Sequence, residues 1–502
     1  MRITSLLFFI FLFVSVVMYY IFPKKYRWIV LLISSLFFFL QASSIYMLCY
    51  LLSGIIATYF GAIFINKTDN EKNKKIILGI TLLIIIGQLF VFKYLNIFPI
   101  TANKFASLFN LNFTFGTLNL IAPLGISYYT LSLISYVVDV YRTVSLPQEN
   151  FLKHSLFACY YPSMISGPIM RFEEMKKSLF EERKTDLNNI IQGFYRLVFG
   201  LLKKMVIADQ LAIIVKFVFN GSASHTGLFI IIGLLAYAIQ IYNDFSGCMD
   251  IVIGASKMYG VKMPENFDSP LLSRNLSEFW RRWHISLGTW AKDYIMYPLL
   301  MTKFFQNIGT KCKKKFGKKI GKQIPTFLAI LILWLLIGLW HGTSYKYIFA
   351  AGILPWIYLT TSELCEVLLT KITTYLKIKT NTFSYRLFES FRTLALMCFL
   401  WLFVCVSSLS DSLSTLKSIF VFSDISFSKI FNLVPSKAII VALMLVFVVD
   451  YLNYKGINAF EKFEEQNIWF RYMVLLLIIA IILVYGAYGA EYNPADFIYG
   501  GF

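Results

Sequence analysis

Long apolar segments recur along this 502-residue chain from one end to the other. A helix needs about 20 apolar residues to cross the hydrocarbon core of a bilayer, and many of these segments approach that length. With 58% hydrophobic residues and a mean hydropathy of +0.66, too few polar groups remain to cover a water-facing surface. We therefore predict an all-α polytopic membrane protein with about 11–12 transmembrane helices. The candidate spans are Leu6–Phe22, Trp28–Leu40, Ile45–Phe64, Ile76–Phe92, Ile121–Val140, Ile190–Leu202, Leu228–Tyr242, Pro325–Trp340, Tyr347–Cys365, Phe391–Ser407, Ala438–Tyr451 and Tyr472–Tyr488.

Four further segments are neither long apolar runs nor soluble loops, and we interpret them as interfacial or re-entrant. Irregular backbone at membrane depth is tolerated where protein or a water-filled cavity satisfies its polar groups, so such segments are expected to line a funnel. No Gly/Ser-rich linker, internal repeat or separate soluble domain interrupts the pattern, which favours a single domain over residues 1–502. The four segments are Lys93–Leu120, His154–Met170, Lys262–Leu300 and Phe420–Pro435.

The formal net charge of +20 reports membrane topology rather than nucleic-acid binding. Lys and Arg lie in short segments between apolar runs, as the positive-inside rule expects of cytoplasmic faces. The densest, Lys311–Lys322, is expected to be a cytoplasmic loop near anionic lipid headgroups, with contact to a carrier protein or CoA as the alternative. The seven cysteines lack the paired spacing of zinc sites or disulfide frameworks, so we predict no metal site.

Two of the four histidines, His284 and His341, directly follow tryptophan in a chain where almost everything else is apolar. An imidazole titrates near neutral pH and can take a proton from a hydroxyl. Polar side chains at bilayer depth are costly, so each is a functional candidate. Gly342, after His341, would let a substrate approach the backbone closely. We interpret the other two histidines, His154 and His225, as an interfacial residue and a solvated loop residue.

The stretch Ser277–Trp290 is expected to form one amphipathic helix in an interface. Trp280 and Trp283 would lie on one face, and Arg281 and Arg282 on another. The arginines either anchor lipid headgroups or hold the phosphates of a cytosolic acyl donor, since guanidinium groups bind phosphate in bidentate fashion.

Several motifs, in their order along the chain, resemble the membrane-bound O-acyltransferase family, and within it the branch of the alginate O-acetyltransferase membrane subunit. The resemblance is strongest over residues 1–363, whereas 366–502 is similar only in hydropathy and reads as C-terminal transmembrane helices. The motifs are Pro123–Thr130 with Asp139–Arg142, Ser166–Arg171, Asp244–Gly247, Pro264–Phe267, Glu278–Ser286 and Gly338–Gly342.

The resemblance implies a helical bundle around a central funnel in the bacterial cytoplasmic membrane. His341 matches the family's essential histidine and would act as catalytic base, whereas His284 matches a second histidine with a supporting role. Asn243 and Asp244 would orient groups around the constriction, with a role in helix packing as the alternative. The substrate-binding candidates are Trp280, Arg281, Arg282, Trp283, Asn243, Asp244 and Trp340.

The resemblance also implies a reaction. An acetyl group would pass from a cytosolic thioester, such as acetyl-CoA, across the membrane for O-acetylation of an extracytoplasmic polysaccharide, with no bound cofactor. The implied partner outside is an SGNH-hydrolase-like acetyltransferase. One alternative is the D-alanine transfer protein of teichoic acid modification, whose donor is an acyl-carrier protein. Another is a non-enzymatic transporter, although the paired repeats common in transporters are not evident.

Overall fold

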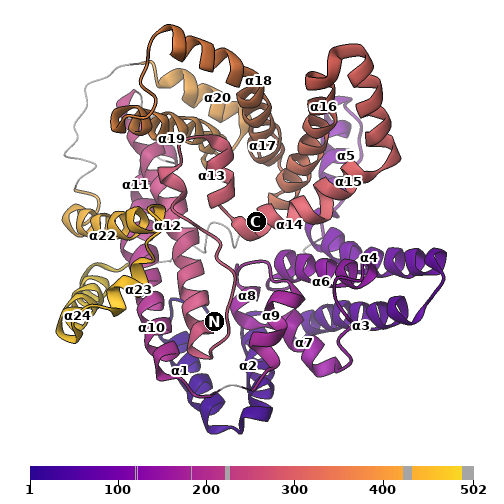
Figure 1. The fold of residues 1–502 in the computed structure, drawn as a ribbon, viewed down its shortest axis with the longest axis vertical. Coiled ribbons are helices and arrows are strands. Elements are labelled where there is room, and N and C mark those ends of the chain that lie inside the picture. Colours follow the sequence, from indigo (N-terminus) through magenta and orange to yellow (C-terminus); the bar gives the residue numbers. More distant parts are fainter. Residues whose placement is uncertain (119, 121, 183, 221–226, 422–431, 489–502) are drawn as a thin grey trace. The chain divides into compact units, whose positions relative to one another are not determined.

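The computed structural model describes residues 1–502 apart from 119, 121, 183, 221–226, 422–431 and 489–502. The described residues form helices and connecting segments without a strand, and a single isolated bridge joins Phe267 to Trp283. The expected all-α architecture is confirmed (Figure 1). His225 and most of the expected interfacial segment Phe420–Pro435 lie outside the described residues.

Nine helices in the described part of the chain are long and apolar enough to cross a membrane. They match nine of the twelve expected spans. The other three expected spans correspond to helices of 15 or 16 residues, namely α1 (Leu6–Ile21), α6 (Ile126–Tyr141) and α10 (Leu187–Leu201). Most of α6 is buried against other helices, among them α3 (Ile45–Lys67) and α4 (Glu71–Tyr94). By length and composition, the structure therefore supports fewer spans than apolar runs alone indicate.

The chain divides into two compact units, and the first comprises Met1–Leu197 with Val252–Pro264. His154, on α7 of this unit, is fully buried, and its Nε2 atom lies 2.9 Å from the Thr58 hydroxyl. Burial lowers the pKa of His154 to about 3, so the residue is a neutral core histidine and the interfacial interpretation is wrong. Besides α1, α3, α4 and α6, the helices of this unit are η1 (Lys24–Tyr26), α2 (Arg27–Ala42), α5 (Ile97–Leu108), α7 (Phe151–Cys159), α8 (Tyr161–Met164), α9 (Phe172–Phe180) and most of α10.

The second unit comprises Val198–Ile251 and Glu265–Phe502. Short helices fill its expected re-entrant stretch between two long apolar helices, α12 and α16. The helices of this unit are η2 (Leu202–Ala208), α11 (Asp209–Asn220), most of α12 (Leu228–Met258), η3 (Pro270–Leu272), α13 (Leu276–Arg282), α14 (Ile285–Ala291), η4 (Lys292–Met296), α15 (Tyr297–Met301), α16 (Lys303–His341), α17 (Tyr345–Ile348), η5 (Phe349–Ile353), α18 (Leu354–Tyr375), α19 (Phe383–Cys405), α20 (Leu409–Ser418), α22 (Ser436–Tyr454), α23 (Ala459–Glu464) and α24 (Ile468–Tyr485).

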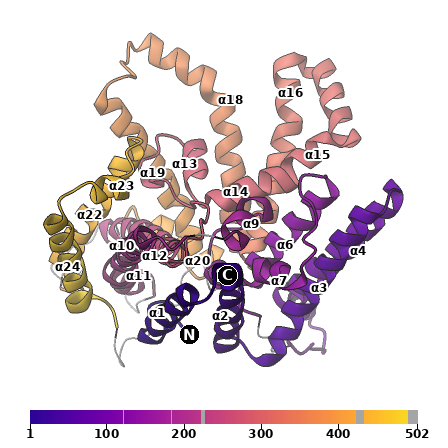
Figure 2. The same cartoon turned by 60° about the horizontal axis from the view of Figure 1, so that its bottom comes forward.

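The basic segment Lys311–Lys322 is not a loop but the turn of a helical hairpin. Within α16, Gly317 has a φ of 83°, a left-handed conformation that suits glycine and reverses the chain. A Cβ at Gly321 would lie 2.4 Å from the backbone of Lys313, so the two arms of the hairpin touch there (Figure 2). The second arm leads from the lysine-rich turn to His341.

A buried charge cluster joins η2 to α12 in the second unit. We define it as Lys203, Lys204, Asp209, Asp244 and Asp250. The Lys203 ammonium lies 2.8 Å from Asp250, and the Lys204 ammonium lies 2.5 Å from Asp244 and 2.9 Å from Asp209. Every one of these side chains is less than 10% exposed. Buried charges are tolerated when paired in this way, so the cluster fastens the two segments together.

Candidate active site

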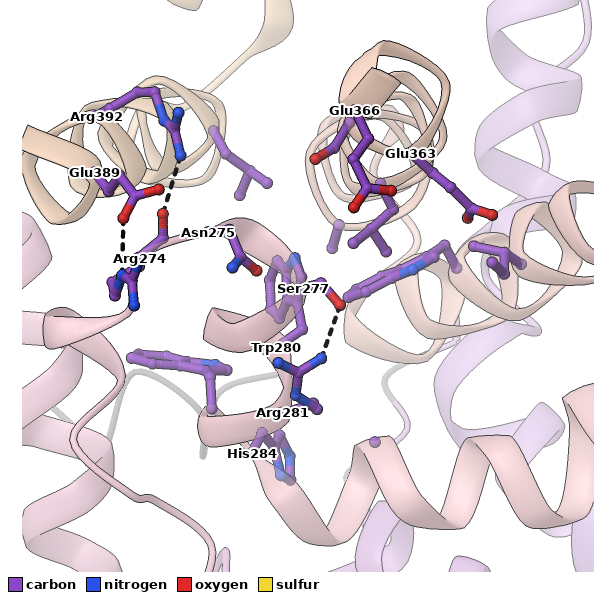
Figure 3. Close-up of a pocket in the computed structure, with 18 of the residues that line it drawn as sticks. Arg274, Asn275, Ser277, Trp280, Arg281, His284, Glu363, Glu366, Glu389 and Arg392 are labelled. Atoms are coloured by element: carbon purple, nitrogen blue, oxygen red, sulfur yellow. Dashed lines mark hydrogen bonds and ion pairs between the residues drawn. The ribbon is translucent and has the colours of Figure 1, made fainter. Parts of the chain in front are cut away.

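A cavity of about 1020 Å³ lies within the second unit and is lined by both tryptophan-flanked histidines, His284 and His341. Its walls come from α12, α13, α14, η4, α16, α17, η5, α18, α19 and segments between them. Aromatic and aliphatic side chains form one part of the lining, whereas charged residues of α18 and α19 form another, among them Glu363, Glu366, Glu389 and Arg392 (Figure 3). A large cavity with a few convergent polar groups is the usual form of a small-molecule site.

His284 lies between two short helices rather than inside one. The expected single helix over Ser277–Trp290 is wrong, because α13 ends at Arg282 and α14 begins at Ile285. His284 itself has φ 49° and ψ 52°, a left-handed conformation that is uncommon outside glycine. Such strain persists only where the surroundings hold it in place, and it concentrates at functional sites.

His284 contacts both aromatic rings and a hydrogen-bonding side chain. Its ring lies edge-on to Phe245 at 4.9 Å between centroids and 6.2 Å from the Trp340 ring. Its Nδ1 atom lies 3.2 Å from the side-chain oxygen of Asn266. Burial lowers the pKa of His284 well below its ordinary range, and the nearby His341 lowers this pKa further. The imidazole is therefore neutral at physiological pH.

His341 ends the second arm of α16, and its ring lies against the Trp340 ring at 5.0 Å. The two glycines of this motif serve protein packing. A Cβ at Gly338 would lie 2.9 Å from the Tyr347 carbonyl oxygen, and one at Gly342 would lie 2.4 Å from the Tyr347 ring. The space that we expected a substrate to use beside Gly342 is thus filled by Tyr347, which corrects that interpretation.

The tryptophans of α13 shape the cavity wall. Trp280 packs against Trp334 of α16 at 4.6 Å, and its indole nitrogen is buried without a hydrogen-bond partner among the described residues. Trp283 stacks on Phe279 at 5.5 Å and also contacts Trp401 of α19. Both tryptophans line the cavity.

The neighbouring arginines Arg281 and Arg282 have different surroundings. Arg281 lines the cavity and donates a hydrogen bond to Ser277, without an ion pair to any described carboxylate. Arg282 does not line it and forms ion pairs with Glu278 at 3.0 Å and Asp268 at 2.6 Å. Of these two arginines, Arg281 is the one placed to meet a ligand in the cavity.

The remaining expected site residues, Asn243, Asp244 and Trp340, do not line the cavity. Asn243 is buried on α12 and donates to the Ile239 carbonyl oxygen. Asp244 belongs to the buried charge cluster. The Trp340 ring contacts the rings of both histidines but does not itself line the cavity. In this structure these residues support the site rather than face it.

The cavity also contains charged residues that the sequence analysis did not single out. Arg274 and Glu389 form an ion pair at 2.8 Å, and Arg392 donates to the Arg274 carbonyl oxygen. Lys292 also lines the cavity, and no described carboxylate pairs with it. The signal was present in the sequence, since Glu389 and Arg392 lie inside an apolar helix, where charges are rare. Among the described residues, no cluster of His, Cys, Asp or Glu has the makings of a metal site.

Comparison with known proteins gives a consistent result. Residues 146–311 match the sequence model of the membrane-bound O-acyltransferase family. The chain is 33% identical over 347 residues to the probable alginate O-acetylase AlgI of Pseudomonas aeruginosa, covering 68% of this chain and 62% of that protein. It is 32% identical over 356 residues to the peptidoglycan O-acetyltransferase of Helicobacter pylori, covering 65% and 62%. With the teichoic acid D-alanyltransferase of Bacillus subtilis it shares 31% identity over 238 residues, covering 46% and 56%. The matched region thus spans about three fifths of the length of the alginate and peptidoglycan relatives.

Proposed function

This chain belongs to the membrane-bound O-acyltransferase family, and we propose that it moves an acetyl group from a cytosolic thioester across the cytoplasmic membrane for O-acetylation of an extracytoplasmic polysaccharide. The observation that carries the proposal is the meeting of His284 and His341 on the wall of one cavity. Relatives of similar sequence are the probable alginate O-acetylase AlgI and a peptidoglycan O-acetyltransferase.

His341 is the base in this proposal. Its imidazole takes the proton of an acceptor hydroxyl while the hydroxyl oxygen attacks the thioester carbonyl carbon. The carbon–sulfur bond then breaks, the proton passes to the departing sulfur, and an ester and a free thiol result. The aromatic wall of Trp280, Trp283 and Trp334 supports the proposed reaction, because polar interactions are stronger beside low-dielectric side chains than in water.

Acetyl-CoA is the proposed donor. Arg281 and Lys292 both line the cavity, and neither forms an ion pair with a carboxylate among the residues that the structure describes. Two positive charges are therefore available to phosphate groups. Guanidinium groups bind phosphate well, and an ammonium adds a point charge.

The acceptor side involves a second protein in this proposal. The family resemblance implies an SGNH-hydrolase-like partner outside the membrane that completes transfer to the polymer. The nine long apolar helices in the described part of the chain support a multi-pass membrane protein, within which a group can pass from one face to the other.

D-alanyl transfer is the second candidate, because the chain also resembles a teichoic acid D-alanyltransferase. The donor would then be a thioester on a carrier protein. The chemistry at His341 would be the same, and the two candidates differ in what delivers the acyl group.

The test is transfer of radiolabel by the purified protein in proteoliposomes, with acetyl-CoA and D-alanyl-carrier protein offered separately. Acetyl-CoA should label the acceptor in the wild type, and His341→Ala should abolish labelling. Labelling from the carrier protein alone would instead establish D-alanyl transfer. Movement of an intact solute without labelling would establish a transporter and overturn the proposal.

A further inference from the structure

The side chain of Asn266 is the hub of three hydrogen bonds beside the cavity. Its Oδ1 atom lies 3.0 Å from the Ser286 backbone nitrogen, 2.9 Å from the Ser286 hydroxyl and 3.2 Å from His284 Nδ1. Its Nδ2 atom points instead to the Met249 sulfur at 3.3 Å. Asn266 is fully buried, so these contacts are shielded from water.

The orientation of the Asn266 amide follows from its partners. A backbone N–H can only donate, so the Asn266 atom that faces the Ser286 nitrogen must be the oxygen. The amide therefore cannot be flipped without losing this bond. The same oxygen faces His284 Nδ1, and since an amide oxygen only accepts, Nδ1 must carry the hydrogen.

A neutral imidazole with hydrogen on Nδ1 has an unprotonated Nε2. We propose that Asn266 is a positioning residue that holds His284 in this tautomer, so that His284 presents a hydrogen-bond acceptor to an O–H or S–H group of a substrate in the cavity. The substrate-facing part of this inference rests on the proposed acyl transfer.

The backbone reinforces the same arrangement. The Ile285 nitrogen donates to the Asn266 carbonyl oxygen at 3.0 Å, and the Asp268 nitrogen donates to the Arg282 carbonyl oxygen at 3.0 Å. Residues on both sides of His284 are therefore tied to the segment that carries Asn266. These bonds hold His284 in its left-handed conformation, which the free chain would disfavour.

Several titratable and charged groups lie on the elements around His284. His341 approaches from α16, and Arg281 and Arg282 lie on α13. On α12, Asp244 and Asp250 are paired with lysines of the buried charge cluster. The neutral amide of Asn266 lies at hydrogen-bond distance from Nδ1.

The first test reads the tautomer directly, by solid-state nitrogen-15 NMR of histidine-labelled protein in lipid bilayers. His284→Gln identifies the His284 signals by their loss. We expect a protonated Nδ1 and an unprotonated Nε2 in the wild type, and a mixture of tautomers in Asn266→Leu. Ser286→Ala is the matched control, because it removes one contact to the same oxygen and should keep the wild-type tautomer. Protonated Nε2 in the wild type, or an unchanged tautomer in Asn266→Leu, would overturn the proposal.

The second test uses Asn266→Asp, which keeps an accepting oxygen and so stays informative if Asn266→Leu does not fold. A carboxylate beside Nδ1 stabilises the imidazolium, so the pKa of His284 should rise by about one to three units in an NMR titration. The tautomer of the neutral ring should stay as in the wild type. Transfer near pH 8 should remain within about tenfold of wild type and should decline as the pH falls through the raised pKa. An unchanged His284 pKa would contradict the contact.

The positioning role of Asn266 and the proposed acyl transfer can be disproved separately. The NMR measurements do not depend on turnover, so the expected nitrogen signals in a wild-type protein without transfer would count against the proposed function alone. Full transfer in Asn266→Leu with a scrambled tautomer would count against the catalytic use of His284.

Discussion

Two polar regions of the second unit treat their charged and titratable groups in opposite ways. In the buried charge cluster, each ammonium contacts a carboxylate and every side chain is buried. On the cavity wall, Arg281 has no described carboxylate partner, and two imidazoles face a space large enough for a substrate. The difference separates groups that hold helices together from groups available to a ligand, although both kinds interrupt apolar sequence.

The comparison predicts that cavity-wall variants change rate while charge-cluster variants change stability. His341→Ala should give the largest effect, a loss of about 10²–10⁴ in turnover, because a general base contributes on this scale. Radiolabel transfer measures the rate, and thermal unfolding in detergent should show an intact fold. Wild-type turnover in this variant would show that His341 is not the general base.

A charge-cluster variant should do the reverse. Lys203→Met leaves the Asp250 carboxylate buried without its partner and should cost about 3–5 kcal/mol of stability. The double variant Lys203→Met with Asp250→Leu should recover most of that loss, since an apolar pair replaces an ion pair. Thermal unfolding of both proteins checks this, and equal destabilisation of the single and double variants would contradict it.

Gly342→Ala should produce a mixed effect, since it acts on packing behind a cavity residue. The new methyl would collide with the Tyr347 ring, costing about 1–3 kcal/mol and displacing His341. A displacement near 1 Å lowers turnover by about 10²-fold. Tyr347→Ala in the same protein should restore part of the rate. Gly87→Ala, where no atom lies within 4 Å of the added methyl, is the control.

The adjacent arginines give the smallest and most selective contrast. Arg281→Ala should raise KM for acetyl-CoA about tenfold, since a charged hydrogen bond is worth about 1.5 kcal/mol. Arg282→Ala should instead lower stability by up to about 1 kcal/mol per lost surface ion pair. Steady-state kinetics with varied acetyl-CoA and thermal unfolding distinguish the two variants. An identical change of KM in both would contradict the assignment of phosphate binding to Arg281 alone of the two arginines.

Much of the architecture was predictable, because apolar length reports helices directly. The pair His284 and His341 was also predictable, since both stand out chemically in apolar sequence. The partners of polar residues were not predictable. A role in helix packing was one alternative for Asp244, but the lysine that pairs with it lies 40 residues earlier, beyond any local pattern. The different fates of Arg281 and Arg282 likewise depend on carboxylates brought near by folding.

The break at His284 was missed for a related reason. The residues Ser277–Trp290 have helical spacing and contain no proline, and their one glycine, Gly288, lies after the break. Tertiary hydrogen bonds from Asn266, 18 residues earlier, override that local preference. Local periodicity describes the secondary structure that a segment prefers in isolation. Here the hydrogen bonds to Asn266, which is distant in the sequence, determine that the helix is interrupted at His284.

The buried charge cluster also constrains how the protein is made. Asp244 lies near the middle of a 31-residue apolar helix, where a lone aspartate costs about 2.5–3.5 kcal/mol on insertion into a membrane. Its counter-ion, Lys204, lies on η2 and is synthesised before Asp244, so it is present when α12 emerges from the ribosome. We therefore expect η2 and α12 to enter the bilayer together as partners in ion pairs, so that the insertion of α12 depends on the segment made before it.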